Sequence, residues 1–116
     1  MRHKKKKATL GRVKPQREAL MRSLAESLIL HGSIKTTKAK ARALRSFVEP
    51  LITKAKKGDL TARRNLIKVL YTDKVINKLL KDVAPGYKDR QGGYTRIIKI
   101  GPRANDSADM VRIEFV

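Results

Sequence analysis

The sequence predicts an α+β protein in which four helices precede a C-terminal antiparallel hairpin, with a basic extension at the N-terminus. Apolar residues recur at three-to-four spacing up to Val83. The pattern changes to strict alternation after Gln91-Gly92-Gly93. The first 14 residues carry seven Lys or Arg and no Asp or Glu. We therefore expect residues 1–14 to form a basic extension and residues 15–116 to form one globular domain.

The first helix is expected over about Gln16–His31. Pro15 suits the first turn of a helix, and Gly32 suits a C-terminal cap. The apolar face that defines this helix contains Leu20, Met21, Leu24 and Leu28.

The second helix is expected over about Lys38–Lys57, between Thr37 as N-cap and Gly58 as terminator. Pro50 removes one backbone donor from its interior, which predicts a kink or a local break at that point. The apolar face continues in phase beyond the proline and contains Ala41, Leu44, Val48, Leu51, Ile52 and Ala55.

Two shorter helices follow, and Asp59 and Asp73 are expected to be their N-caps. Their apolar runs cover residues 60–70 and 75–83. Ala84-Pro85-Gly86 and Gln91-Gly92-Gly93 are expected to bracket a loop.

Two strands are expected at the C-terminal end, over Tyr94–Ile100 and Asp109–Val116, because both alternate apolar and polar side chains. The connection Gly101–Ala108 has the length of a hairpin loop, so the two strands should be antiparallel neighbours. A short strand near Ile34 could join them and complete a three-stranded sheet.

The composition argues against catalysis and against a membrane partner. There is no cysteine, and His3 and His31 are the only histidines. No His, Asp or Glu cluster has metal-ligand spacing, and no glycine loop has the context of a nucleotide site. No apolar run reaches the roughly 18 residues of a membrane span. We expect a soluble, cytoplasmic protein that is not an enzyme and takes no cofactor, metal or small-molecule substrate.

The charge indicates a polyanionic partner. The 29 Lys and Arg residues exceed the 10 Asp and Glu residues and give a formal charge of +19. Each cation that neutralises a phosphate releases counterions, so the basic extension predicts nucleic-acid binding through Lys5, Lys6, Lys7, Arg12, Lys14 and Arg17 as well as its first residues. The alternative is a merely solvated tail.

Two further segments could contact RNA. At the corner Ile34-Lys35-Thr36-Thr37-Lys38, a helix N-terminus offers free backbone donors for phosphate, although Thr37 could simply cap the helix. The segment Tyr87–Arg96 combines glycines, tyrosines and cations, which fits recognition of a folded nucleic acid. The alternative is an ordinary turn in which Tyr94 belongs to the core.

Several motifs resemble those of the bacterial large-subunit ribosomal protein seventeen family. They are Met1-Arg2-His3, the Ile34–Thr37 corner, Val48–Lys56, Gly58-Asp59-Leu60 followed by Arg63-Arg64, and Gly92–Ile97. The resemblance runs along the whole chain and implies a non-enzymatic component of the large subunit. The rRNA contacts that it implies are Arg2, His3, Lys4, Lys35, Thr36, Thr37, Arg63, Arg64, Gly93, Tyr94 and Arg96.

The expected function is therefore that of a structural constituent of the large ribosomal subunit, which binds large-subunit rRNA and supports assembly and translation. Neighbouring large-subunit ribosomal proteins are the expected protein partners. A DNA-architectural protein of the nucleoid is the alternative, although we find no minor-groove wedge or dimer pattern. A membrane-active cationic protein is a third class, disfavoured because the helical apolar faces are committed to a core.

Overall fold

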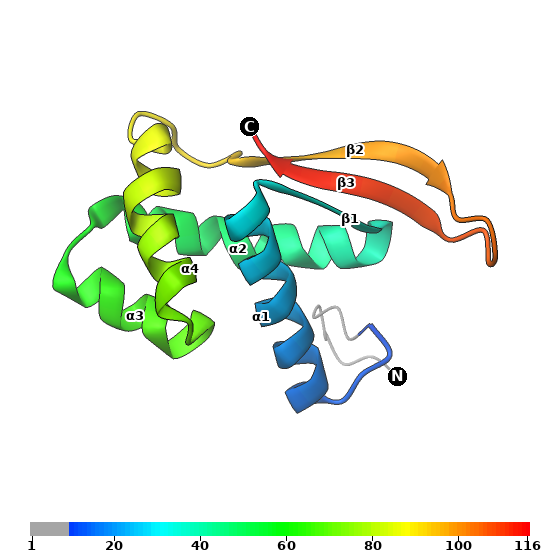
Figure 1. The fold of residues 1–116 in the computed structure, drawn as a ribbon, viewed down its shortest axis with the longest axis horizontal. Helices are drawn as coiled ribbons and strands as arrows, with labels where there is room; N and C mark the ends of the chain where they lie inside the picture. Colours follow the sequence, from blue (N-terminus) through cyan, green and yellow to red (C-terminus); the bar gives the residue numbers. More distant parts are fainter. Residues whose placement is uncertain (1–9) are drawn as a thin grey trace, which may run out of the picture.

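The computed structural model describes residues 10–116 and confirms the α+β class. The chain forms four α-helices and a three-stranded sheet, and the first strand lies between the first two helices in sequence (Figure 1). The elements are α1 (Lys14–His31), β1 (Ser33–Thr37), α2 (Lys38–Lys57), α3 (Leu60–Leu70), α4 (Asp73–Lys78), a π-helical turn η1 (Leu79–Val83), a 3₁₀ turn η2 (Ala84–Tyr87), β2 (Thr95–Pro102) and β3 (Asp109–Phe115).

The sheet has the strand order β1-β3-β2, and both pairings are antiparallel. The short strand expected near Ile34 therefore exists, and it pairs with β3 rather than with β2. Ile34 and Ile97 both stand opposite Ile113 of the central strand. The register shifts between Lys99 and Gly101, and the hairpin of β2 and β3 extends past the helices (Figure 1).

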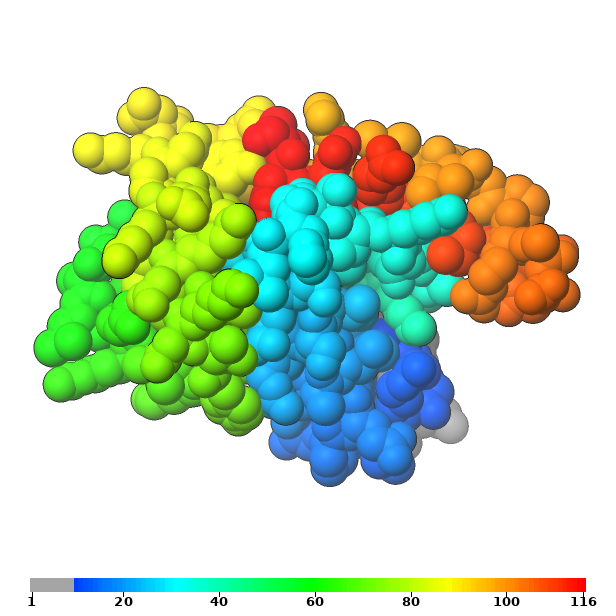
Figure 2. All heavy atoms as spheres, in the orientation of Figure 1, coloured from blue at the N-terminus to red at the C-terminus, as the bar shows by residue number. Residues whose placement is uncertain are grey.

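Helices α1 and α2 pack on one face of the sheet, while α3 and α4 lie toward the end away from the hairpin tip (Figure 1). On the face seen in Figure 2, α4 and its continuation lie against α1. Val111 and Ile113 of β3 are buried in the core, as their alternation predicts. The fully buried side chains that share this core include Leu28, Ile29, Leu44, Val48, Ile52, Leu66, Leu70, Val75, Ile76 and Leu79.

Local signals fix most helix ends. Gly32 and Gly58 end α1 and α2 in the left-handed conformation, with φ of 79° and 64°. The Thr37 hydroxyl accepts a hydrogen bond from the Lys40 amide at 3.4 Å. The Asp59 carboxylate accepts one from the Ala62 amide at 2.7 Å. These four expectations are confirmed.

One expectation is wrong, and two others have a more detailed outcome. Thr72, not Asp73, is the N-cap of α4, and Asp73 lies in the first turn. The bracketed loop is confirmed: Ala84-Pro85-Gly86 belongs to the 3₁₀ turn η2, and irregular backbone follows it up to the start of β2 at Thr95. Of the two alternatives expected at Pro50, the local break does not occur, because α2 continues through the exposed proline, while the kink stays a prediction.

Burial predicts which apolar side chains the fold needs. Ile52 of α2 is completely buried, so Ile52→Ala should lower the free energy of unfolding by about 2–5 kcal/mol, because it removes buried apolar surface and leaves a cavity. Ile67 of α3 is 42% exposed, and the matched variant Ile67→Ala should change the free energy of unfolding by less than about 0.5 kcal/mol. Urea denaturation measures both, and equal losses would contradict this core.

Candidate nucleic-acid interface

The cations of the described chain are mostly not neutralised by its carboxylates. Residues 10–116 contain three ion pairs, which are Arg45–Glu49 at 3.1 Å, Arg96–Glu114 at 2.9 Å and Arg103–Asp106 in the hairpin turn. All three are on exposed or half-exposed side chains, where such pairs contribute little to stability. The positive charge is therefore available to a partner rather than consumed within the fold.

The N-terminal candidates divide into two groups. Arg2, His3 and Lys4 to Lys7 lie outside the described residues. Arg12 lies just before α1, and its guanidinium donates to the Leu10 carbonyl at 2.8 Å. Lys14 and Arg17 stand on the first turns of α1.

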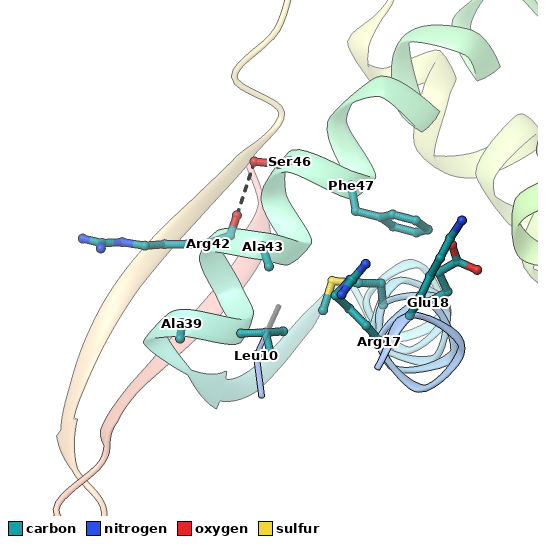
Figure 3. A pocket seen from close by; sticks show the side chains of 10 residues that line it. Leu10, Arg17, Glu18, Ala39, Arg42, Ala43, Ser46 and Phe47 are labelled. Carbon is teal, nitrogen blue, oxygen red and sulfur yellow. Dashed lines mark hydrogen bonds between the residues drawn. The ribbon is translucent and has the colours of Figure 1, made fainter. Parts of the chain in front are cut away.

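Lys14 and Arg17 line a groove between the N-terminal halves of α1 and α2, with a volume of about 840 Å³. Figure 3 shows Arg17, Glu18 and Phe47 facing this space, whereas the Arg42 guanidinium extends away from α1. The lining residues are Leu10, Lys14, Arg17, Glu18, Met21, Ala39, Arg42, Ala43, Ser46 and Phe47. The groove thus combines an apolar floor with a partly cationic rim.

The predicted corner is a direct strand-to-helix junction, because α2 begins at the residue after β1 ends. Lys35 is exposed, and its partner on the neighbouring strand is Arg112, which is exposed as well. Like charges directly opposite each other across two strands are destabilising. This pair of cations would gain from a bound anion.

The threonines of the corner have different environments. Thr36 is buried, with 7% of its surface exposed, while the Thr37 side chain caps α2. Lys38 is half-buried in the first turn of α2. The capping alternative for Thr37 is thus realised, and the exposed cations of the corner are Lys35 and Arg112.

The glycine loop before β2 is held by a single carboxylate. Glu49 Oε1 accepts a hydrogen bond from the Gly93 amide at 3.0 Å, and Glu49 Oε2 accepts one from the Thr95 hydroxyl at 3.1 Å. Gly92 and Gly93 both have positive φ, at 82° and 60°, which a side chain would strain. Two segments distant in sequence therefore form one structural unit.

Tyr94 belongs to the core, as the alternative expectation had it, and its side chain is 1% exposed. Its ring lies 5.3 Å from that of Tyr87, centroid to centroid. Hydrogen bonds from the Thr53 hydroxyl, the Gly92 backbone and the Lys56 ammonium lower the pKa of Tyr94 to about 8. The buried ring offers no free face for stacking a base, whereas Arg96, two residues further along, is exposed.

The two arginines of α3 differ. Arg63 donates to the Asn77 side-chain oxygen at 2.9 Å and so joins α3 to α4. Arg64 is exposed and makes no ion pair within residues 10–116. Arg64 is therefore the better placed of the two for an external anion.

One cationic surface was not predicted from the sequence. Lys74, Lys78 and Lys81 recur at four- and three-residue spacing along α4 and η1. With Leu30, His31, Asn77 and one acid, Asp82, they line a groove of about 490 Å³ beside the C-terminal end of α1. The lysine spacing was the available signal, but a helical lysine stripe is equally typical of a solvated face.

Within residues 10–116, His, Asp and Glu side chains form no group of three that could hold a metal ion. The same residues contain no helix with the length and apolar character of a membrane span.

Comparison with known proteins finds similarity over almost the whole chain. The family described as Ribosomal protein L17 matches residues 20–116. A protein of Desulfitobacterium hafniense named "Large ribosomal subunit protein bL17" is 50% identical over 92% of this chain and 96% of its own length. Proteins with the same name from Gemmatimonas aurantiaca and Syntrophotalea carbinolica are 50% and 51% identical over all of this chain, and over 98% and 75% of their own lengths.

The role of Glu49 can be tested without RNA. Glu49→Ala removes the acceptor of the Gly93 amide, so that amide should exchange with deuterium faster, and the free energy of unfolding should fall by about 1–3 kcal/mol. Glu18→Ala is the matched control, because Glu18 is exposed and accepts no hydrogen bond in the described structure. Unchanged exchange at Gly93 would show that Glu49 does not hold the loop.

Proposed function

Because the chain belongs to the ribosomal protein L17 family, we propose that it is a structural constituent of the large ribosomal subunit that binds large-subunit rRNA. It would thereby support subunit assembly and translation in the cytoplasm. The observation that supports RNA binding is the excess of cations over acids. The whole chain has a formal charge of +19, and only three ion pairs occur within residues 10–116.

Phosphate contacts would supply most of the affinity, because each one releases condensed counterions from the nucleic acid. Residues 1–14 would act as a basic extension that follows the phosphate backbone, and Lys14 and Arg17 would continue this contact onto α1. Lys35, with Arg112 opposite it, and Arg64 and Arg96 would anchor the globular part.

Contacts at several surfaces would fix the shape of folded RNA rather than read its sequence. The described molecule has extents of 43 × 32 × 25 Å, and the hairpin and α3–α4 lie at opposite ends of its long axis (Figure 1). A protein of that span can touch more than one RNA segment at once. Neighbouring large-subunit ribosomal proteins would be its protein partners.

Sedimentation tests this function directly. Tagged full-length protein from a bacterial lysate should co-sediment with the large ribosomal subunit and stay there after a high-salt wash, because contacts across a folded RNA surface exceed simple charge attraction. Loss at moderate salt, or a spread over free nucleic acid with equal affinity for duplex DNA, would favour the nucleoid alternative instead.

The basic extension makes a separate prediction. A variant with Ala in place of Lys4, Lys5, Lys6 and Lys7 should bind large-subunit rRNA more weakly. The slope of log K against log salt concentration should become less negative by roughly 0.7–0.9 for each phosphate that is no longer neutralised. Binding titrations at several salt concentrations measure the slope. The control replaces the same four lysines by Arg and should keep the slope, whereas an unchanged slope in the Ala variant would exclude the extension from phosphate binding.

A further inference from the structure

Tyr71 stands in a strained and exposed position between two helices. It is one of two residues that join α3, which ends at Leu70, to α4, which begins at Asp73. Its φ of 63° is left-handed, a conformation that glycine adopts readily and that is disfavoured for a bulky side chain. Glycine would end α3 equally well, so local geometry gives no reason for a tyrosine here.

The Tyr71 side chain is also 65% exposed. In residues 10–116 the other aromatic side chains, Phe47, Tyr87, Tyr94 and Phe115, are all buried or half-buried. An aromatic side chain loses favourable burial free energy when it stays in water. The backbone strain and the exposure of the ring thus both cost folding stability. Such costly features accumulate at functional sites.

Arg22 of α1 covers one face of this ring. Its guanidinium carbon lies 4.4 Å from the ring centroid, within the range of a cation–π contact. Arg22 makes no ion pair within the described residues. Glu26, one helical turn further along α1, instead accepts a hydrogen bond from the Thr72 hydroxyl at 2.9 Å.

These contacts hold the ring in a fixed place. The Glu26–Thr72 bond ties the junction to α1, and the Thr72 amide donates to the Leu70 carbonyl at 2.8 Å. Arg22 supports the ring from one side. The result is a preorganised flat surface, which loses little side-chain freedom when a partner binds.

We propose that Tyr71, supported by Arg22, is a stacking platform for an unpaired base of large-subunit rRNA. Proteins recognise folded RNA largely through unstacked bases that lie on aromatic rings or on arginine guanidinium planes. Lys68 and Lys74, three residues before and after Tyr71, supply charge for the adjoining phosphates. This inference rests on the proposed function and specifies one chemical contact within it.

The test separates stacking from structural support. Tyr71→Gly removes the ring and relieves the left-handed strain, and Tyr71→Phe keeps the ring. With full-length protein and large-subunit rRNA, the Gly variant should bind roughly 5- to 150-fold more weakly, the range expected for one stacked base. The Phe variant should bind as the wild type does. Neither should change the salt dependence, because stacking releases no counterions.

Thermal unfolding of the same variants completes the design. Tyr71→Gly relieves the left-handed strain and also removes the contact with Arg22, so its melting temperature should stay within a few degrees of the wild-type value. A fall of more than about 8 °C, which corresponds to more than about 1 kcal/mol, would identify Tyr71 as a structural anchor and contradict the proposal. UV cross-linking of the complex, followed by mass spectrometry, should place a nucleotide adduct on Tyr71.

The remaining outcomes are distinguishable. If wild-type protein binds rRNA and Tyr71→Gly binds equally well, the platform is wrong and the proposed function stands. If the wild type itself does not bind rRNA, the proposed function fails and the platform fails with it. A cross-link from Tyr71 to a neighbouring protein in assembled subunits would show that the ring contacts a protein. That result would contradict stacking on an RNA base.

Discussion

The carboxylate of Glu49 joins helix α2 to the start of the β2–β3 hairpin. It lies on α2, the helix that packs against α1, α3, the sheet and the turns that follow α4. The Glu49 carboxylate accepts hydrogen bonds from the Gly93 amide and the Thr95 hydroxyl, and so fixes where β2 begins. Lys56, two turns along the same helix, donates to the Tyr94 hydroxyl at 3.0 Å. Together they orient the hairpin relative to the core.

Other acidic side chains also hold parts of the fold together. Glu49 and Glu26 accept hydrogen bonds from distant segments, Asp59 caps α3, and Asp106 accepts from Arg103 within the hairpin turn. Asp106 consequently has its pKa lowered to about 2, mainly by the hydrogen bond from Arg103. These carboxylates keep their charge, but the 10 acids of the chain cannot offset its 29 lysines and arginines. A surface of this kind repels itself until a polyanion covers it.

Elements governed by neighbouring residues were predictable from sequence, and those governed by distant ones were not. Thr37, Asp59 and the glycines 32 and 58 act within one helical turn, so their roles followed from local rules. Thr72 replaced Asp73 as a cap, and its hydroxyl bonds to Glu26, 46 residues away in sequence. The burial of Tyr94 likewise depends on Lys56 and Tyr87. Of the candidate site, the sequence indicated the cationic segments, while the pairing of Lys35 with Arg112 and the exposure of Tyr71 required the fold.

The strand order β1-β3-β2 has a consequence for the time course of folding. β1 and β2 do not pair with each other, and both depend on β3, which is the last of the three to leave the translating ribosome. During synthesis the helices can condense early, but the sheet must wait for residues 109–115. Its contacts span most of the chain, which slows folding. The surface that carries Lys35 beside Arg112 therefore forms only after β3 has been synthesised, and a shorter nascent chain cannot present it.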